Sequence, residues 1–154
     1  MITMPKVPRY SQFRPASEAA SVAKRRNRSR DTRAEMLLRR ELWRRGLRYR
    51  LHDGSLPGKP DIVFRRARVA VFVDGDFWHG RNWEERRTKL QHGANAAYWI
   101  PKIEANIARD RFTTAALKRL GWKVARLWET DVLANPLRAA NRVQRLIGQT
   151  PFRV

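Results

Sequence analysis

Residues 59–80 read KPDIVFRRARVAVFVDGDFWHG, and the expected architecture of the chain follows from this stretch. Its two apolar runs, DIVF and VAVFV, flank the turn-like sequence RRAR, which predicts two short β-strands. The runs are nearly continuous, as in strands that are covered on both faces of a sheet. Asp61 opens the first strand, and Asp74, Asp76 and His79 follow the second. Carboxylates and a histidine at strand ends are suited to holding a metal ion and a water molecule.

The rest of the chain supplies helical and strand-like patterns. Thr32 and Glu35 have the spacing of a capping box at the start of a helix that Gly46 ends. Residues 80–97 are polar and lack a clear period, so we expect a basic surface loop there, with room for a turn of helix. The other predicted elements are helices at 33–45, at 98–120 and from Pro136 onward, and strands at 47–52 and 122–128. This order predicts a small α/β sandwich with a central mixed β-sheet flanked by helices.

The composition points to a polyanionic partner. The 154 residues include 34 Lys and Arg against 14 Asp and Glu, which gives a net charge of +20. Such a charge favours nucleic acid as the partner, with an anionic membrane surface as the runner-up. No apolar run approaches the length of about 18 residues that a membrane span requires. No signal-peptide pattern follows Met1, so we expect a cytoplasmic protein.

Cysteine is absent from the chain. No disulfide can therefore form, and no thiolate can bind a metal. Oxygen or imidazole ligands must hold any metal ion, which points to Mg²⁺ or a similar hard ion.

Residues 1–30 differ from the remainder and are predicted to form a basic N-terminal arm before a single domain at 31–154. Three prolines disfavour early helix, and the segment KRRNRSR follows at 24–30. A solvated tail is the alternative, but the overall charge favours an arm that folds along a phosphate backbone. The cations assigned to DNA binding are Lys24, Arg25, Arg26 and Arg28.

Asp110 and His79 form the most informative combination. Asp110 lies on the packing face of the helix predicted at 98–120, where a carboxylate is costly unless something pairs with it. A histidine or a hydrated metal would satisfy it, and His79 lies in the stretch richest in site-like residues. An Asp–His pair would orient the imidazole and keep it basic enough to take a proton from water. For His79 taken alone, a structural histidine is the alternative.

Three other carboxylates are ambiguous when taken one by one. Asp61 stands at the entry to a strand, where Asp is disfavoured, or it closes a turn. Asp74 either belongs to a turn with Gly75 or contacts a metal or water. Glu35 is either a helix cap or a site residue, because it shares a face with the buried stripe of its helix. Together with the charge of +20, these residues indicate metal-assisted hydrolysis of a phosphodiester.

Aromatic residues accompany the same cluster. Phe77 and Trp78 follow each other within it, and Trp99 lies near the start of the long helix. Two large neighbouring rings cannot both point inward along a strand. An exposed ring could insert between base steps or stack on a displaced base. Packing of the site floor is the alternative.

Six sequence blocks occur in order: DTxxE, LRYRLH, LPGKPD, VFVDGDFWHG, YWxxKIxxNxxRD and GWxVxRxWE. Together they resemble the very-short-patch repair (Vsr) DNA mismatch endonucleases of the PD-(D/E)xK superfamily, over roughly Lys24 to Glu129. The resemblance implies a restriction-endonuclease-like three-layer sandwich. It also implies Mg²⁺-dependent nicking of double-stranded DNA on the 5′ side of a thymine mispaired with guanine.

The resemblance also assigns roles to single positions. Asp61 matches the family's metal-binding aspartate, and the backbone carbonyl of Val73 matches a second metal contact. His79 matches the catalytic histidine that activates water, and Asp110 matches its carboxylate partner. Glu35 matches a glutamate near the water molecules of the metal. The aromatic wedge that the family inserts beside the mismatch is matched by Phe77, Trp78 and Trp99.

The chain departs from the family at two places. The family commonly holds a structural zinc with cysteines and a histidine. This chain has none of these residues at the matching positions, so we expect no structural zinc here. The resemblance therefore leaves open how the lesion is read in this region. The corresponding positions are Asp76, Arg81, Trp83 and Thr130. Asp74 stands where some members carry a histidine, which changes the charge beside the metal.

The leading functional hypothesis is therefore a strand-nicking endonuclease for T:G mismatches. The alternative is a Vsr-like nuclease of a restriction or defence system without strict mismatch specificity. A third reading, a DNA-binding module with a vestigial site, is disfavoured because Asp61, His79 and Asp110 are all present. We expect a monomer at the bacterial nucleoid that acts on double-stranded DNA, not on membranes, with repair or defence proteins as candidate partners.

Overall fold

The computed structural model describes residues 30–148 of the chain. The predicted arm at 1–30 lies outside this range apart from Arg30, and so do the arm cations Lys24, Arg25, Arg26 and Arg28. Within 30–148, no helix combines the length and the apolar character that crossing a membrane would require.

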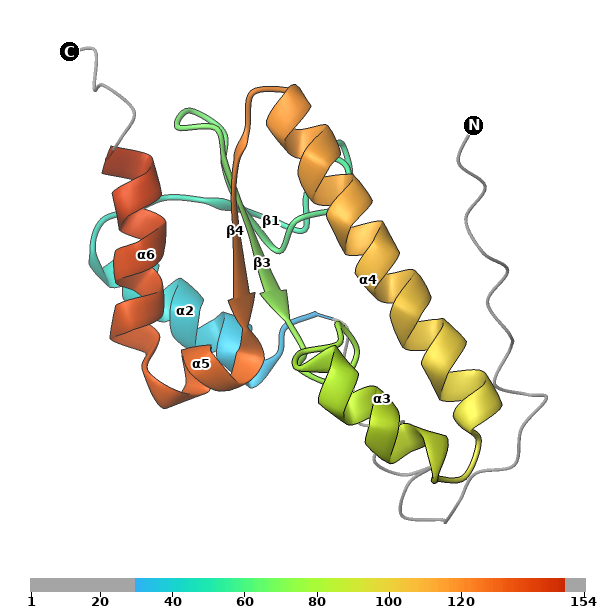
Figure 1. Ribbon diagram of the computed structural model, residues 1–154. Helices are drawn as coiled ribbons and strands as arrows, with labels where there is room; N and C mark the ends of the chain where they lie inside the picture. Colours follow the sequence, from blue (N-terminus) through green and yellow to red (C-terminus); the bar gives the residue numbers. More distant parts are fainter. Residues whose placement is uncertain (1–29, 149–154) are drawn as a thin grey trace.

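Four strands form one mixed sheet in the order β1-β2-β3-β4 (Figure 1). Antiparallel pairing joins β1 to β2 and β2 to β3, and Val63 lies opposite Ala70, so the predicted hairpin is confirmed. β4 runs parallel to β3. A parallel partner requires a long crossover, which the segment containing helix α4 (Ala96–Arg119) supplies. The strands are β1 Arg50–Leu51, β2 Ile62–Phe64, β3 Val69–Asp74 and β4 Lys123–Trp128.

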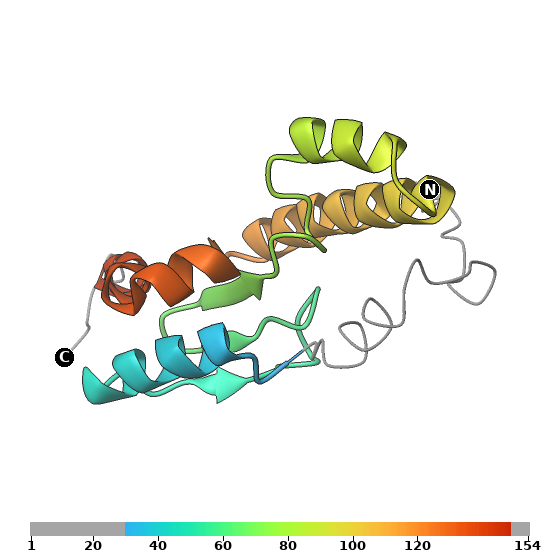
Figure 2. The same cartoon turned by 90° about the horizontal axis from the view of Figure 1, so that it is seen from below.

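Helices cover both faces of the sheet, as the predicted sandwich requires (Figures 1 and 2). Three helices, α2 Arg33–Arg44, α5 Glu129–Ala134 and α6 Pro136–Gly148, pack on one face around the larger hydrophobic core. On the other face, Ala70 and Phe72 of β3 pack with Leu117 of α4. Successive residues of β3 therefore enter different layers, which explains its continuous apolar sequence. The predicted fold class, an α/β sandwich with a central mixed sheet, is confirmed.

Helix α3 (Trp83–Gln91) lies where the sequence predicted a basic surface loop with room for a turn of helix, so the segment is more helical than expected. None of its residues is buried. A helix without a buried stripe leaves no apolar period in the sequence, although it packs along α4. The short helix α5 was not predicted either, and it buries only Val132.

Strand β1 is shorter than the predicted strand at 47–52. Only Arg50 and Leu51 pair with β2. Leu47 and Tyr49 pack against the core, but they do so without strand pairing, and Leu51 is 42% exposed. The alternating apolar pattern therefore predicted the packing of Leu47 and Tyr49 correctly, but it predicted a strand that is too long.

Candidate active site

The start of β2, the end of β3 and the middle of α4 meet at one open cleft of about 430 Å³. Because β2 runs antiparallel to β3, the beginning of β2 lies beside the end of β3. The return of the chain through α4 adds a third wall. The predicted site residues that line this cleft are Asp61, Val73, Asp74, His79 and Asp110.

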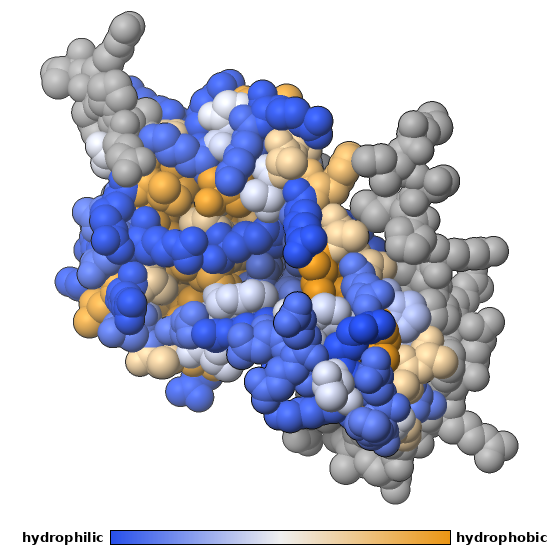
Figure 3. Space-filling model, viewed as in Figure 1, coloured by the Kyte–Doolittle hydropathy of each residue, from blue (hydrophilic) through white to orange (hydrophobic). Residues whose placement is uncertain are grey.

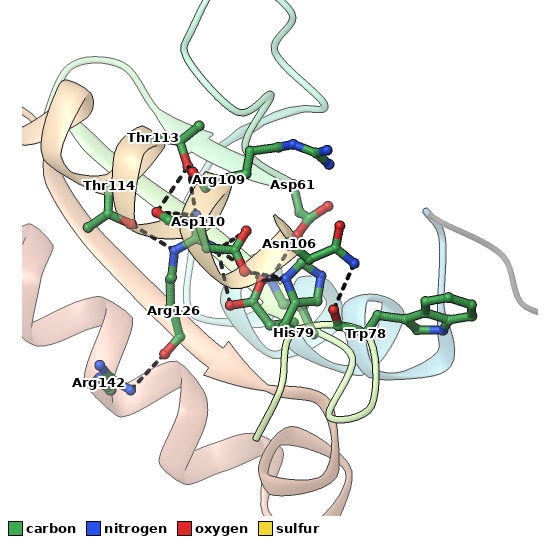
Figure 4. A network of polar contacts seen from close by, with 12 residues as sticks. Asp61, Trp78, His79, Asn106, Arg109, Asp110, Thr113, Thr114, Arg126 and Arg142 are labelled. Atoms are coloured by element: carbon green, nitrogen blue, oxygen red, sulfur yellow. Dashed lines mark hydrogen bonds and ion pairs between the residues drawn. The ribbon is translucent and has the colours of Figure 1, made fainter. Parts of the chain in front are cut away.

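His79 and Asp110 form the pair that the sequence predicted (Figure 4). Nδ1 of His79 lies 2.5 Å from Oδ2 of Asp110 and 3.7 Å from Oδ1 of Asp74. Burial disfavours the charged imidazole, but the Asp110 hydrogen bond and the two carboxylate charges outweigh it and raise the pKa of His79. Within residues 30–148, no side chain hydrogen-bonds Nε2 of His79. This nitrogen can therefore accept a proton.

Helix α4 also holds the turn that carries His79. The side-chain amide of Asn106 donates a hydrogen bond to the carbonyl of Trp78 at 2.9 Å. Gly80 has a φ of +68°, and a Cβ added there would come within 2.9 Å of Cγ1 of Ile107. Only glycine allows this backbone conformation at this closeness to the helix.

Asp61 is a buried carboxylate without a strong cationic partner. Its side chain is 15% exposed, and its Oδ2 accepts a hydrogen bond from the Val73 N–H at 2.8 Å. Among the residues at 30–148, only Nδ1 of His52 comes within ion-pair distance, at 3.8 Å. Burial raises the pKa of Asp61 to about 7, despite the Val73 hydrogen bond, and the charges of Glu35 and Asp74 add to the rise.

This environment fits a hard cation. An uncompensated buried carboxylate is stabilised by a positive charge brought next to it. The available donors are the oxygens of Asp61 and of the neighbouring backbone at Val73. Such oxygen donors are the ligands that Mg²⁺ prefers.

Arg126 of β4 belongs to the site, although the sequence reasoning did not select it. Its Nη1 lies 3.1 Å from both carboxylate oxygens of Asp74 and 3.5 Å from Oδ1 of Asp110. Its Nε and Nη2 donate to the hydroxyls of Thr114 and Thr113 at 2.8 and 3.0 Å. Burial nevertheless raises the pKa of Asp74. Arg126 therefore fixes the two carboxylates that approach His79.

Glu35 does not line the cleft and lies in a second polar cluster at the start of α2. Thr32 Oγ1 accepts from the Glu35 N–H, as the capping spacing predicted, and Glu35 itself accepts from the Asp31 N–H. Burial raises the pKa of Glu35. Asp31, Glu35 and His52 are close enough to hold a metal ion. However, Nη2 of Arg39 contacts all three at 2.7 to 3.0 Å, so a cation already occupies this place.

The aromatic residues form one cluster beside the site. The ring centroids of Phe77, Trp78 and Trp99 lie 5.2 to 5.5 Å from one another. All three side chains are partly exposed. Phe77 and Trp78 lie in a turn and not on a strand, and both rings join the same cluster. Trp78 points away from the His79–Asp110 pair (Figure 4).

A polar network occupies three of the four positions at which the resemblance placed the family's zinc ligands. Nη1 of Arg81 contacts Asp76 at 3.2 Å, Thr130 at 2.8 Å and Asp131 at 2.9 Å. The Thr130 hydroxyl also donates to Asp76 at 2.6 Å. These bonds connect the turn after β3 to the beginning of α5, and Trp83 opens α3 nearby in sequence. In this chain, side-chain hydrogen bonds therefore hold the turn after β3 against α5, a link that a bound metal ion could also provide.

Known proteins resemble this chain over most of its length. A model of the DNA mismatch endonuclease Vsr family matches residues 13–85. The type II nicking enzyme V.NmeDIP of Neisseria meningitidis serogroup C is 46% identical over 121 residues, which cover 79% of this chain and 80% of that protein. The type II nicking enzyme V.HpaIIP of Haemophilus parainfluenzae is 40% identical over 121 residues, which cover 79% of this chain and 84% of that protein.

A more distant relative is the DNA mismatch endonuclease Vsr of Escherichia coli strain K12. It is 37% identical over 101 residues, which cover 66% of this chain and 63% of that protein. The hairpin that brings Asp61 to the cleft and the turn that carries His79 both lie within the residues matched by the family model. The chain therefore belongs to the Vsr family of DNA endonucleases.

Proposed function

We propose that this endonuclease nicks one strand of duplex DNA on the 5′ side of a thymine mispaired with guanine, in a Mg²⁺-dependent reaction. The observation that carries the proposal is the His79–Asp110 pair, which shares one cleft with the buried carboxylate of Asp61. The pair supplies a base for water, and Asp61 supplies a place for a hard cation. These are the two requirements of metal-assisted phosphodiester hydrolysis.

His79 acts as the general base in this proposal. Asp110 binds the Nδ1 side of the ring, so that Nε2 accepts the proton of the attacking water. The Asp110 carboxylate then stabilises the imidazolium that forms. Asp74, held by Arg126, adds a second negative charge 3.7 Å from Nδ1. Both carboxylates therefore favour proton uptake by the ring.

Asp61 and the Val73 carbonyl would hold the Mg²⁺ ion. When bound, the ion would polarise an oxygen of the scissile phosphate and offset the charge that develops on it. Asp61 is suited to this role because its burial leaves its own charge uncompensated. Glu35 lies next to His52, in the cluster that Arg39 organises, and its charge adds to the rise in the pKa of Asp61.

Positive side chains at the rim of the cleft would receive the DNA backbone. Arg30, Lys59 and Arg109 line the same cleft as Asp61 and His79. Cations placed around a cleft raise the local concentration of a polyanionic substrate and position its phosphates. The acidic centre is thus surrounded by groups that attract the backbone which it is to cut.

Two duplexes of identical sequence, one matched and one carrying a single T:G mismatch, test the proposal in the presence of Mg²⁺. We expect nicking of the mismatched duplex on the 5′ side of its thymine. Asp61→Ala and His79→Ala should abolish nicking and leave DNA binding intact, whereas Asp53→Ala, a carboxylate outside the cleft, should nick normally. Normal cutting by either site variant would show that the site is assigned wrongly.

Nicking without a mismatch requirement is the second candidate function. Two of the relatives described above are named type II nicking enzymes, and the positions of the zinc ligands carry the Arg81 network. Equal cutting of the matched and mismatched duplexes would favour this second function.

Under the first proposal, the aromatic cluster inserts beside the mismatch. Trp78→Ala should then reduce the ratio of mismatched to matched cutting, and an unchanged ratio would leave the ring with a packing role only.

A further inference from the structure

One exposed face of helix α6 is entirely cationic. Arg138, Arg142 and Arg145 recur at intervals of four and three residues, which places them along one side of the helix. All three are exposed, and α6 contains no Asp or Glu. The opposite side, with Val143 and Ile147, is buried in the core. We call these three residues the α6 arginine face.

This face borders a hollow and is not a flat surface. A depression of about 380 Å³ lies between α6, α5 and β4, and all three arginines line it. In Figure 3, hydrophilic side chains extend over an apolar hollow in the region between α6 and β4. Nη1 of Arg142 donates to the backbone carbonyl of Arg126 at 3.0 Å, which holds this side chain against β4 (Figure 4). In the described sheet, β4 pairs with β3 alone, so its other edge faces this hollow.

The positive charge of the face is not neutralised within the described part of the chain. Residues 30–148 contain no ion pair that involves Arg138, Arg142 or Arg145. The acidic residue that lines the same hollow is Asp131, and Arg81 already binds its carboxylate at 2.9 Å. The exposed guanidinium groups are therefore free to bind an external anion.

The α6 arginine face lies one strand away from the catalytic cleft. Arg126 connects the two, because its backbone carbonyl binds Arg142 and its side chain binds Asp74 and Asp110. A polymer whose phosphate lies in the cleft can continue across β4 toward α6. Arg138 and Arg145 are separated by seven residues of helix, or about 10 Å. Measured along the duplex axis, this spacing corresponds to roughly three nucleotides of one DNA strand.

We infer that the α6 arginine face binds the phosphate backbone of duplex DNA on one flank of the cut. Guanidinium groups form bidentate hydrogen bonds with phosphates, which suits this partner. A membrane surface fits less well, because the apolar side of α6 is buried in the core and cannot enter a bilayer. The inference requires that the enzyme bind duplex DNA, but it is independent of the proposed mismatch specificity.

Salt-dependent binding to a matched duplex without Mg²⁺ tests this inference. The variant R138Q/R145Q removes two cations that make no intramolecular ion pair in residues 30–148, so the fold should persist. Loss of two phosphate contacts should lower the slope of log Kobs against log salt by about 2. The matched control R40Q/R66Q makes the same change in net charge at exposed positions away from the hollow, and its slope should change much less.

Hydroxyl-radical footprinting adds a readout of place. The double variant should lose backbone protection on one flank of the duplex, and the control should keep it. Equal slopes for the double variant and the control would overturn the inference. Loss of binding to phosphatidylglycerol vesicles with an unchanged DNA slope would also overturn it, by assigning the face to a lipid surface. Failure of the wild type to prefer a T:G duplex would refute the proposed function and leave this binding measurement intact.

Discussion

Replacing Asp61 by asparagine should stabilise the folded protein while it removes catalysis. The pKa of Asp61 rises from its ordinary 3.8 to about 7 because the carboxylate is buried. The folded protein therefore binds this proton more tightly than the unfolded chain does. The contribution of the protonated Asp61 carboxyl to stability is fully present below pH 4 and is lost as the pH rises toward about 7. Burial of the Asp61 carboxyl lowers the free energy of unfolding by about 4 kcal/mol at pH 8, where the folded group is ionised, and by about 2 kcal/mol at pH 5, where the group must take up a proton on folding.

The asparagine side chain carries no charge and keeps an oxygen that can accept the Val73 hydrogen bond. Asp61→Asn should therefore exceed the wild type in free energy of unfolding by about 4 kcal/mol at pH 8, which corresponds to roughly 8 to 16 °C in Tm. The gap should shrink by about half at pH 5. Urea unfolding at both pH values, followed by circular dichroism, measures it. Mg²⁺ at pH 8 should stabilise the wild type and leave the variant unchanged.

Asp53→Asn is the matched control with the opposite sign. Hydrogen bonds from Ser55 and the charge of Arg65 lower the pKa of Asp53, so its stabilising effect is present at pH 8 and is lost in acid. The control should therefore be less stable than the wild type at pH 8. Asp61 is not a destabilising buried carboxylate if Asp61→Asn is no more stable than the wild type at pH 8, or if the difference in stability does not narrow at pH 5.

Three further predictions concern the groups around the cleft. Asp110→Asn should lower the nicking rate by about 10² to 10⁴-fold, and the acid limb of its pH–rate profile should move to lower pH because Asp110 raises the pKa of His79; an unmoved limb would separate the two residues functionally. Gly80→Ala should destabilise the fold by about 1 to 3 kcal/mol, measured by urea unfolding, because the added Cβ meets Ile107 at a positive φ; wild-type stability would contradict the close packing. Arg81→Met should lower the Tm because it breaks two contacts that join the turn after β3 to α5 and a third contact within that turn. Addition of zinc should not restore the lost stability, and restoration would reveal a metal site there.

Local patterns predicted the elements that bury a continuous or periodic apolar side. The hairpin at 59–80 followed from apolar runs and turn residues, and the end of the first long helix followed from the glycine at 46. Helix α3 has no buried side and left no such signal. Arg126 did leave a signal in the sequence, because it lies between Val124 and Trp128 on the same face of a strand. An arginine on that face required a partner, but nothing local in the sequence identified Asp74.

The chemical inventory of this enzyme could be read directly from its chain. A charge of +20, the absence of cysteine, and a hairpin that ends in Asp61, Asp74 and His79 are all properties of the sequence. The family blocks then predicted which of these residues act together, and the His79–Asp110 contact agrees with that prediction.

How these groups are charged, and which neighbours hold them, depends on the tertiary structure. Burial of Asp61 follows from the packing of the hairpin, and the contact of Arg126 with Asp74 follows from the parallel return of β4 along β3. The α6 arginine face meets the edge of β4 for the same reason. Such contacts join residues far apart in the chain, so no local period encodes them. These long-range contacts arise because helices must cover both faces of the sheet. The helices and strands that return along the sheet bring their polar residues next to those at the strand ends.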